Sequence, residues 1–405
     1  MNVAIVVWHL DVKGGTQRQA LELARHLKSK GDEVTLYCAH LDRDSCYSEL
    51  LEGLEIVSLH GSSRQRHMGK LRWISYPVEP LFVGDERRLA RMIGHHDVIN
   101  CHEHRAYRTA CFHRKASGTP IVWMMNDLPA SFKKPRRPRN LNAVKDLAHY
   151  LLIGGLIGRW VDLRRVKTID RIVVLDRLNH GLLLNNTGMT STVIRSGLDL
   201  AKFGFVERSA AEATGPFTIF TIGIFFPHRR FEDMVSALGI LKKDGRDVRL
   251  RLAGLESKDR VYSARVRALV RSLELEDRVE FLGAISEEQL VREYSTADAF
   301  AFPHSPQTWG LVVFEAMASG VPVIVSRGCG ASEMLVDGDT AMLVEPARPD
   351  GFATAIRKLM DDPSLRNMLS VSGRRFVEGN IRWDLYADKM MDEFTRVCGN
   401  KERWP

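Results

Sequence analysis

The sequence predicts an α/β protein with two doubly wound domains, and two observations predict this class. Short runs rich in β-branched residues alternate with amphipathic helical segments through the first half of the chain, and the alternation begins again after a turn-rich stretch at residues 207–216. Such alternation is typical of βαβ units in a parallel sheet. The chain has 405 residues, 44% of them apolar, which is enough for two globular domains. Ligands bind beyond the carboxyl ends of the strands in such sheets, so two facing domains place a substrate in a central cleft.

The first half is expected to form seven strands. They are expected at residues 2–8, 33–39, 54–59, 96–102, 119–125, 171–176 and 190–195. After the first strand, Ala20, Leu23, Ala24 and Leu27 recur at helical spacing, and Gly31 suits the C-terminal cap of this helix.

The second half repeats the pattern. Strands are expected at residues 217–223, 248–254, 278–283, 298–303, 321–325 and 340–344, and helices at 231–243, 286–297 and 309–320. The expected domains are therefore residues 1–207 and 208–382. A last helix at residues 383–405 is expected to cross back to the first domain.

The strongest local feature is a helix with good stop signals. Gly320 suits its C-terminal cap, and Pro322 follows just beyond. Free backbone N–H groups and the positive end of the helix dipole make its first turn suitable for a phosphate. This turn comprises Thr308, Trp309, Gly310 and Leu311. Gln307 lies just before the turn and Glu315 one turn inside the helix, although a structural helix with Glu315 facing solvent would show the same spacing.

Two further loops are candidates for phosphate binding. Arg229 and Arg230 lie between the strand at 217–223 and the next helix, where guanidinium groups can bind phosphate oxygens in pairs. Gly14 and Gly15 follow the first strand and allow the backbone to approach a phosphate or sugar, although a glycine pair is more often a plain turn. The sequence has no GxGxxG fingerprint and no GxxxxGK[ST] loop, which disfavours ordinary dinucleotide or ATP binding.

The net charge of +8 is concentrated in one segment. Residues 132–171 hold eleven of the 58 basic side chains and three of the 50 acidic ones, which leaves 47 of each sign elsewhere. This distribution disfavours a nucleic-acid partner, which would need a broad basic surface. The segment also contains apolar residues that can form one face of a helix, including Leu147, Leu151 and Trp160. We hypothesise that it rests on an anionic membrane; the alternative is a helix packed into the first domain with solvated charges.

The six cysteines show no paired spacing, and the N-terminus lacks the features of a signal peptide. We therefore expect reduced thiols and a cytoplasmic protein, with a peripheral position on the inner face of the membrane left open by the basic segment. Cys101, His102, His104, Cys111 and His113 are close in sequence, but their spacing matches no tetrahedral zinc template.

The motifs together resemble those of the retaining glycosyltransferases of family 4, and the resemblance covers nearly the whole chain. The matching segments are VIRSGLDLAKF (193–203), GIFFPHRR (223–230), VEFLGAISEEQL (279–290), ADAFAFP (297–303), QTWGLVVFE (307–315), EAMASGVPVIVS (315–326) and GASEMLVDG (330–338). The resemblance implies two Rossmann-like domains in the GT-B arrangement. It also implies transfer of a hexose from a nucleoside diphosphate sugar to an acceptor hydroxyl of a glycan or lipid-linked glycan.

The resemblance assigns roles to residues on the donor side. Glu315 would bind the nucleotide ribose, Gln307 would contact the transferred sugar, and the backbone of residues 309–311 would hold sugar and diphosphate. Arg229 falls on the diphosphate-binding lysine of the family. Arg230 is a candidate to replace the arginine that the family has at the position of Ile224.

On the acceptor side, His102 matches the second of the family's paired histidines, and Asn126 occupies the place of another histidine. The sequence departs from the family at four positions, which are Gln307 for Glu, Ile224 for Arg, Asn126 for His and Ser196 for Asn. An amide at 307 can only form hydrogen bonds, so we interpret this position as one that orients the substrate. Front-face transfer needs no protein nucleophile, because the departing phosphate helps to deprotonate the acceptor.

The resemblance implies no metal and no other cofactor. Asp42 and Asp44 form a DxD string like the metal-binding triplet of the other glycosyltransferase fold, but they lie in a polar, solvated stretch. Two other functions remain open. An epimerase of nucleotide sugars would share the fold, and a non-catalytic nucleotide-sugar-binding protein would be compatible with the four departures.

Overall fold

The computed structural model describes residues 1–61, 83–132, 153–206, 215–307 and 309–399, with only the backbone at 153–156. The chain forms two compact units, one of Met1–Ser196 with Trp383–Pro405 and the other of Gly197–Arg382. The first boundary thus precedes the expected one at residue 207. The reason is that residues 198–206 bond to the second unit: Leu198 N donates to Ile381 O (3.1 Å), and Val206 N to Ser319 O (3.3 Å).

A parallel sheet forms the centre of the first unit, in the order β3-β2-β1-β4-β5-β6-β7. Its strands are β1 (Asn2–Leu10), β2 (Glu33–Leu41), β3 (Glu55–His60), β4 (Val98–His102), β5 (Ile121–Met125), β6 (Arg171–Val174) and β7 (Thr192–Val193). Each of the seven expected strands is present, and the first strand lies inside the sheet, between β2 and β4.

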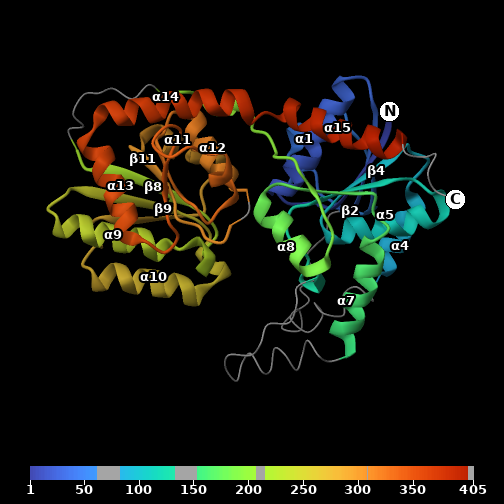
Figure 1. Cartoon of the computed structure of the whole chain (residues 1–405), viewed down its shortest axis with the longest axis horizontal. Helices are drawn as coiled ribbons and strands as arrows, with labels where there is room; N and C mark the ends of the chain where they lie inside the picture. The colour runs from blue at the N-terminus through green and yellow to red at the C-terminus, as the bar shows by residue number, and fades with distance from the viewer. Residues whose placement is uncertain (62–82, 133–152, 207–214, 308, 400–405) are drawn as a thin grey trace. The chain divides into compact units, whose positions relative to one another are not determined.

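Helices cover both faces of this sheet (Figure 1). They are α1 (Gly15–Ser29), α2 (Ser48–Leu51), α4 (Gly84–Met92), α5 (His104–Ser117), α7 (Ile153–Val166), α8 (Arg177–Thr187) and α15 (Trp383–Gly399). On one face, Ala4, Val6 and Trp8 of β1 pack in a core with residues of α4, α5 and α7. Helices α1 and α15 pack against each other on the other face, so the last helix of the chain belongs to the first unit.

The second unit has a parallel sheet in the order β10-β9-β8-β11-β12-β13. Its strands are β8 (Phe217–Ile222), β9 (Val248–Ala253), β10 (Val279–Gly283), β11 (Ala299–Phe302), β12 (Val323–Ser326) and β13 (Met342–Val344). Its helices are α9 (Phe231–Lys243), α10 (Arg260–Ser272), α11 (Glu287–Thr296), α12 (Leu311–Ala318), α13 (Pro349–Asp361) and α14 (Pro363–Asn380). The six expected strands are confirmed.

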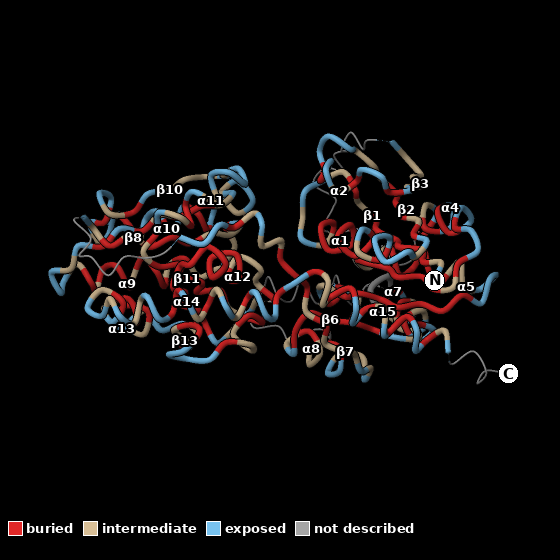
Figure 2. Tube along the Cα trace, turned by 90° about the horizontal axis from the view of Figure 1, so that it is seen from above, coloured by how far each residue is buried: buried red, intermediate tan, exposed pale blue. Residues whose placement is uncertain are grey.

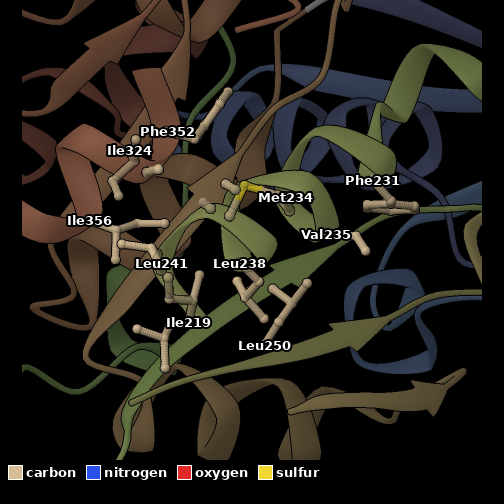
Figure 3. Packing of buried hydrophobic residues seen from close by; sticks show 14 of the residues in the cluster. Ile219, Phe231, Met234, Val235, Leu238, Leu241, Leu250, Ile324, Phe352 and Ile356 are labelled. Atoms are coloured by element: carbon tan, nitrogen blue, oxygen red, sulfur yellow. The ribbon is translucent and has the colours of Figure 1, made fainter. Parts of the chain in front are cut away.

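The core of the second unit lies between the sheet and helices α9, α10 and α13. Figure 3 shows Leu238 and Leu241 of α9 beside Ile219 of β8 and Leu250 of β9, all of them buried. Figure 2 shows that burial follows the central strands of each sheet, whereas the edge strand β3 is only partly buried. Two parallel sheets with helices on both faces are the doubly wound architecture that the sequence predicts. Within the described ranges, no helix has both the length and the apolar character needed to cross a membrane.

Candidate active site

The loop after β8 positions the predicted Arg229 through a glycine. Gly223 ends the strand region, and a Cβ atom there would lie 3.0 Å from the His304 ring and 3.2 Å from Cδ of Arg229. A side chain at this position would push these two neighbours outward by a few tenths of an ångström, so Gly223 favours the close packing of Arg229 and His304 at the carboxyl ends of β8 and β11.

Arg229 joins three side chains into one cluster. Its Nη1 donates to Oε1 of Gln307 at 2.6 Å and lies 3.1 Å from Nδ1 of His304. His304 is 1% exposed, and burial, reinforced by the positive charge of Arg229, holds the pKa of His304 well below its ordinary value. Its imidazole is therefore neutral and can accept the bond from Arg229. We call Arg229, His304 and Gln307 the Arg229 cluster.

The backbone of Gln307, which follows β11, is fixed by two hydrogen bonds to the loop that follows β12. Its N–H donates to the carbonyl of Gly328 (3.2 Å), and its carbonyl accepts from the N–H of Gly330 (2.9 Å). A Cβ atom at Gly328 would lie 2.2 Å from Oγ of Ser305, so this loop also depends on a glycine. The amide of Gln307 is thereby held where a guanidinium group can bind it, and the structure brings together the predicted Arg229 and Gln307.

Helix α12 begins later than the sequence predicts. Gly310 precedes it with φ of 87°, and the helix starts at Leu311 instead of Trp309 because this left-handed residue cannot lie inside a right-handed helix. A Cβ atom at Gly310 would lie 3.0 Å from the Phe302 ring. Trp309 is 4% exposed and packs on Phe314, so it offers its backbone rather than its side chain. Thr308 lies outside the described residues.

Glu315 lies inside α12 and is buried, at 7% exposure. Its Oε2 accepts a hydrogen bond from the hydroxyl of Tyr294 (3.1 Å), and the carbonyl oxygen of Val312, at 3.2 Å, shares the same hydroxyl donor. The alternative of a solvent-facing Glu315 is therefore wrong. A buried carboxylate fixed by a tyrosine can accept bonds from a ribose hydroxyl, which is the chemistry that the resemblance assigns to this residue.

Arg230 differs from its neighbour. Its Nε and Nη2 donate to the two carboxylate oxygens of Asp233 at 2.6 and 2.9 Å. The prediction that Arg230 supplies a missing charge to a ligand is not supported by this arrangement, because the pair neutralises that charge within one helical turn. Ile224, at the position of the family's arginine, is 41% exposed.

In the first unit, Gly15 and Asn126 lie close to each other at the carboxyl edge of the sheet. Gly15 is the first residue of α1, and a Cβ atom there would have no neighbour within 4 Å. Asn126 follows β5, and its Nδ2 donates to Oγ1 of Thr16 at 2.9 Å. Asn179 donates in turn to the carbonyl of Asn126 (2.8 Å). Asn126 is thus held by Thr16 through its side chain and by Asn179 through its backbone carbonyl, and Thr16 directly follows the open Cβ position of Gly15.

His102 cannot contact an acceptor in this structure. It has no exposed surface, its Nε2 lies 2.8 Å from Oδ1 of Asn100, and burial lowers the pKa of His102 to about 3. The expectation that His102 lines the acceptor side is therefore corrected. The next residue, Glu103, has φ of 70° and bonds to Gln17 of α1. Glu103 and His304 were not among the predicted site residues, although Glu103 directly follows β4 and His304 lies two residues after β11.

Helix α7 combines anchoring contacts with an exposed apolar face. Asp162 and Arg108 are fully buried and form a bidentate pair at 2.9 and 2.6 Å, and Arg159 donates to the carbonyl of Asn186 at 2.8 Å. Ile157 and Trp160 are 42% and 53% exposed, and Arg164 stacks on the ring of Trp160. Residues 133–152 of the basic segment lie outside the described residues.

Across the described part of the chain, no group of three or more His, Cys, Asp or Glu side chains is arranged to hold a metal ion. Cys101 and Cys111 are buried thiols, and burial raises the pKa of Cys111 to about 11. Asp42 accepts bonds from Ser45 and from the N–H of Asp44, which is a local turn.

Two family models match the chain. "Glycosyltransferase Family 4" matches residues 13–202, and "Glycosyl transferases group 1" matches residues 205–376, so the two together account for both units. The chain belongs to the group 1, family 4-like glycosyltransferases. Its two Rossmann-like domains are those of the GT-B fold, and Arg229, Gln307 and Glu315 lie within the group 1 match.

Individual relatives and structures agree with this family. A D-inositol 3-phosphate glycosyltransferase of Corynebacterium diphtheriae is 35% identical over 37% of this chain and 35% of that protein. A phosphatidyl-myo-inositol mannosyltransferase of Mycolicibacterium smegmatis is 24% identical over 97% of this chain and 92% of that one. Several other curated relatives are matched over only about a third to a half of their own length. The structure of Anabaena HepE in complex with UDP has the same fold, with a TM-score of 0.74 at 14% identity over 98% of this chain and 100% of that one.

Proposed function

We propose that this glycosyltransferase moves a hexosyl group from a nucleoside diphosphate sugar to a hydroxyl of a glycan or lipid-linked glycan, with retention of configuration and without a metal. The observation that carries the proposal is the Arg229 cluster at the carboxyl ends of β8 and β11, with Gln307 Oε1 2.6 Å from the guanidinium group. A fixed guanidinium can stabilise the charge that develops on a departing diphosphate.

The amide of Gln307 supports front-face transfer. An amide is a poor nucleophile, and here its oxygen already accepts a bond from Arg229. In the proposed step, the bond between the anomeric carbon and the diphosphate oxygen breaks while the acceptor oxygen bonds to the same face. The acceptor proton passes to the departing phosphate oxygen. The protein then contributes charge stabilisation and orientation rather than a covalent intermediate.

A panel of donors tests this function. UDP, GDP and ADP sugars would be added to the purified protein in a thermal-shift assay, where a ligand at 100 times its Kd stabilises by about 2.7 kcal/mol. UDP sugars come first because a protein of the same fold was solved with UDP. The donor that binds would then be incubated with D-inositol 3-phosphate, phosphatidyl-myo-inositol and a lipid extract, because two relatives are named for inositol acceptors.

The products distinguish the alternatives. Transfer of the sugar with an α-linkage from an α-linked donor supports the proposal, and activity that persists with a chelator supports metal independence. A changed sugar formed from the donor alone would indicate an epimerase. Nucleotide binding without transfer to any acceptor would indicate a non-catalytic binding protein.

We further propose that the basic segment, residues 132–171, holds the enzyme on an anionic membrane that carries the acceptor. The exposed Ile157 and Trp160 lie three residues apart on α7, which places them on one side of the helix. Arg164 lies one turn further along and stacks on Trp160. Apolar side chains with basic neighbours on one side of a helix are the arrangement that interfacial helices use.

A further inference from the structure

We propose that Glu103 binds the acceptor hydroxyl that receives the sugar. The inference rests on the proposed function and adds a residue to the acceptor side of that site. Glu103 directly follows β4, which is the central strand of the first sheet and neighbours β1. The carboxyl edge of such a sheet is where ligands bind.

The backbone of Glu103 is held in an unusual conformation. Its φ of 70° and ψ of 168° belong to a region that glycine adopts readily and other residues avoid. Glu103 also precedes α5 in the capping position, yet its side chain makes no capping bond to that helix. The glutamate is therefore not explained as a helix cap, and its carboxyl group is turned toward α1 instead.

The first turn of α1 holds this carboxyl group. Nε2 of Gln17 donates to Oε1 of Glu103 at 3.0 Å, and Gln17 is itself 5% exposed. Gly14 makes this arrangement possible, because a Cβ atom there would lie 2.5 Å from Oε1 of Gln17. The preceding residue, Thr16, accepts a hydrogen bond from Nδ2 of Asn126 through its Oγ1 (2.9 Å). Successive residues of one helical turn thus fix an amide after β5 and a carboxyl group after β4.

The chemistry of this pair suits a polyhydroxy ligand. A carboxylate accepts bonds from hydroxyl groups, and a carboxamide both donates and accepts, so Glu103 and Asn126 can bind neighbouring hydroxyls of a sugar or cyclitol. Gly15 directly precedes Thr16, the partner of Asn126, and a Cβ atom at Gly15 would have no neighbour within 4 Å. Carboxylate bonds to hydroxyls are among the stronger hydrogen bonds and fix orientation as well as affinity.

The protonation state of Glu103 predicts how acceptor use depends on pH. Burial is the largest influence and raises the pKa of Glu103 to about 7. Asp11 raises the pKa further, whereas His104, the amide of Gln17 and the backbone of Trp8 oppose the shift. Because the carboxylate is the form that accepts a bond from a hydroxyl, acceptor use is expected to rise with pH through about 7 and then to level off.

The test compares E103Q with wild type. Both proteins would be assayed from pH 5.5 to 9 with the donor and acceptor identified by the panel above. E103Q is expected to lower kcat/KM for the acceptor at pH 8 by about tenfold or more and to remove the rise near pH 7. Its thermal shift with the nucleoside diphosphate is expected to equal that of wild type. E33Q is the matched control, because Glu33 is an exposed glutamate at the amino end of β2.

Three outcomes would overturn the inference. They are an E103Q profile that matches wild type, an equal loss of nucleotide binding in E103Q, and a Glu103 carboxyl that titrates below pH 5 in ¹³C NMR of the wild-type protein. The NMR titration also decides the matter if E103Q does not fold. A wild-type protein that transfers sugar to no acceptor would instead overturn the proposed function, and this inference with it.

Discussion

At the scale of single residues, Arg229 and Arg230 are neighbours with different surroundings. Arg229 bonds to Gln307 and lies beside the neutral His304, whereas Arg230 is neutralised by Asp233. A ligand diphosphate can therefore gain more from Arg229 than from Arg230, although both residues follow the same strand.

We expect R229Q to weaken binding of the nucleoside diphosphate by about 10- to 100-fold, because a hydrogen bond to a charged group is worth about 1.5 to 3 kcal/mol. R230Q is expected to change binding by less than about threefold. Isothermal titration calorimetry with the nucleotide found in the donor panel measures both. Equal losses in the two variants would contradict the assignment of Arg229 to the diphosphate.

Glu103 also predicts how stability depends on pH. Its pKa of about 7 lies above the ordinary value of 4.5, so the folded protein holds this proton more tightly than the unfolded chain does. The contribution of the protonated Glu103 to the free energy of unfolding is fully present below about pH 4.5. It is lost as the pH rises through about 7. The loss is on the order of 3 kcal/mol, because each pKa unit corresponds to about 1.4 kcal/mol.

E103Q cannot ionise at this position, so its urea midpoint should fall less between pH 5 and pH 8 than that of wild type. Tryptophan fluorescence follows the transition, because Trp8 and Trp123 are buried in the first unit. Parallel pH profiles for E103Q and wild type would rule out a raised pKa.

At the scale of elements, the start of α12 depends on Gly310. A residue other than glycine would be strained at φ of 87°. In addition, a Cβ atom at Gly310 would lie 3.0 Å from the Phe302 ring. Gly338 is the matched control, since its φ of 76° is similar and no atom lies within 4 Å of its Cβ position.

G338A is expected to lower the free energy of unfolding by about 1 kcal/mol, the usual penalty for a left-handed alanine. G310A should lower it by at least about 1 kcal/mol more, because Phe302 must shift in a packed core. Urea unfolding of the two variants compares them directly. A G310A protein that is no less stable than G338A would show that contact with Phe302 adds no cost at this position.

The attachment of α7 is a second prediction at this scale. Asp162 and Arg108 are fully buried, so D162N leaves a buried guanidinium without its counter-charge. We expect a loss of about 3 kcal/mol or more in the free energy of unfolding. D361N, which removes the exposed bidentate partner of Arg246, should cost less than about 1 kcal/mol. Similar costs for the two variants would show that the buried pair does not anchor the helix.

At the scale of the whole molecule, the distribution of charge separates one segment from a neutral remainder. Residues 132–171 carry the entire net charge of +8. Each basic residue near an anionic bilayer contributes about 1 kcal/mol to binding, and this contribution falls with salt.

We therefore expect the protein to float with liposomes rich in anionic lipid at low salt and to dissociate at high salt. Changing Lys133, Lys134, Arg136 and Arg137 to Gln should abolish flotation. A control with the same change of charge in the second unit, made at the exposed Lys258, Arg260, Arg271 and Arg292, should float normally. Equal flotation of both variants would contradict the membrane proposal.

Much of this architecture is readable from the sequence. Thirteen strands were expected and are present, because short β-branched runs between helical segments depend on local spacing alone. The motif QTWGLVVFE and the charged segment are equally local. Helix α12 was misjudged by two residues, since the left-handed turn at Gly310 depends on its packing against Phe302 from β11.

The sequence by itself thus determined the fold class, the family and the segments that could carry function. The tertiary structure alone decided which side chains meet. Arg229 and Gln307 are 78 positions apart and bond directly, whereas His102 is buried and its neighbour Glu103 bonds to α1, 86 positions away. The physical reason is that burial and hydrogen bonding at a strand end depend on elements that arrive from elsewhere in the chain, which local periodicity does not record.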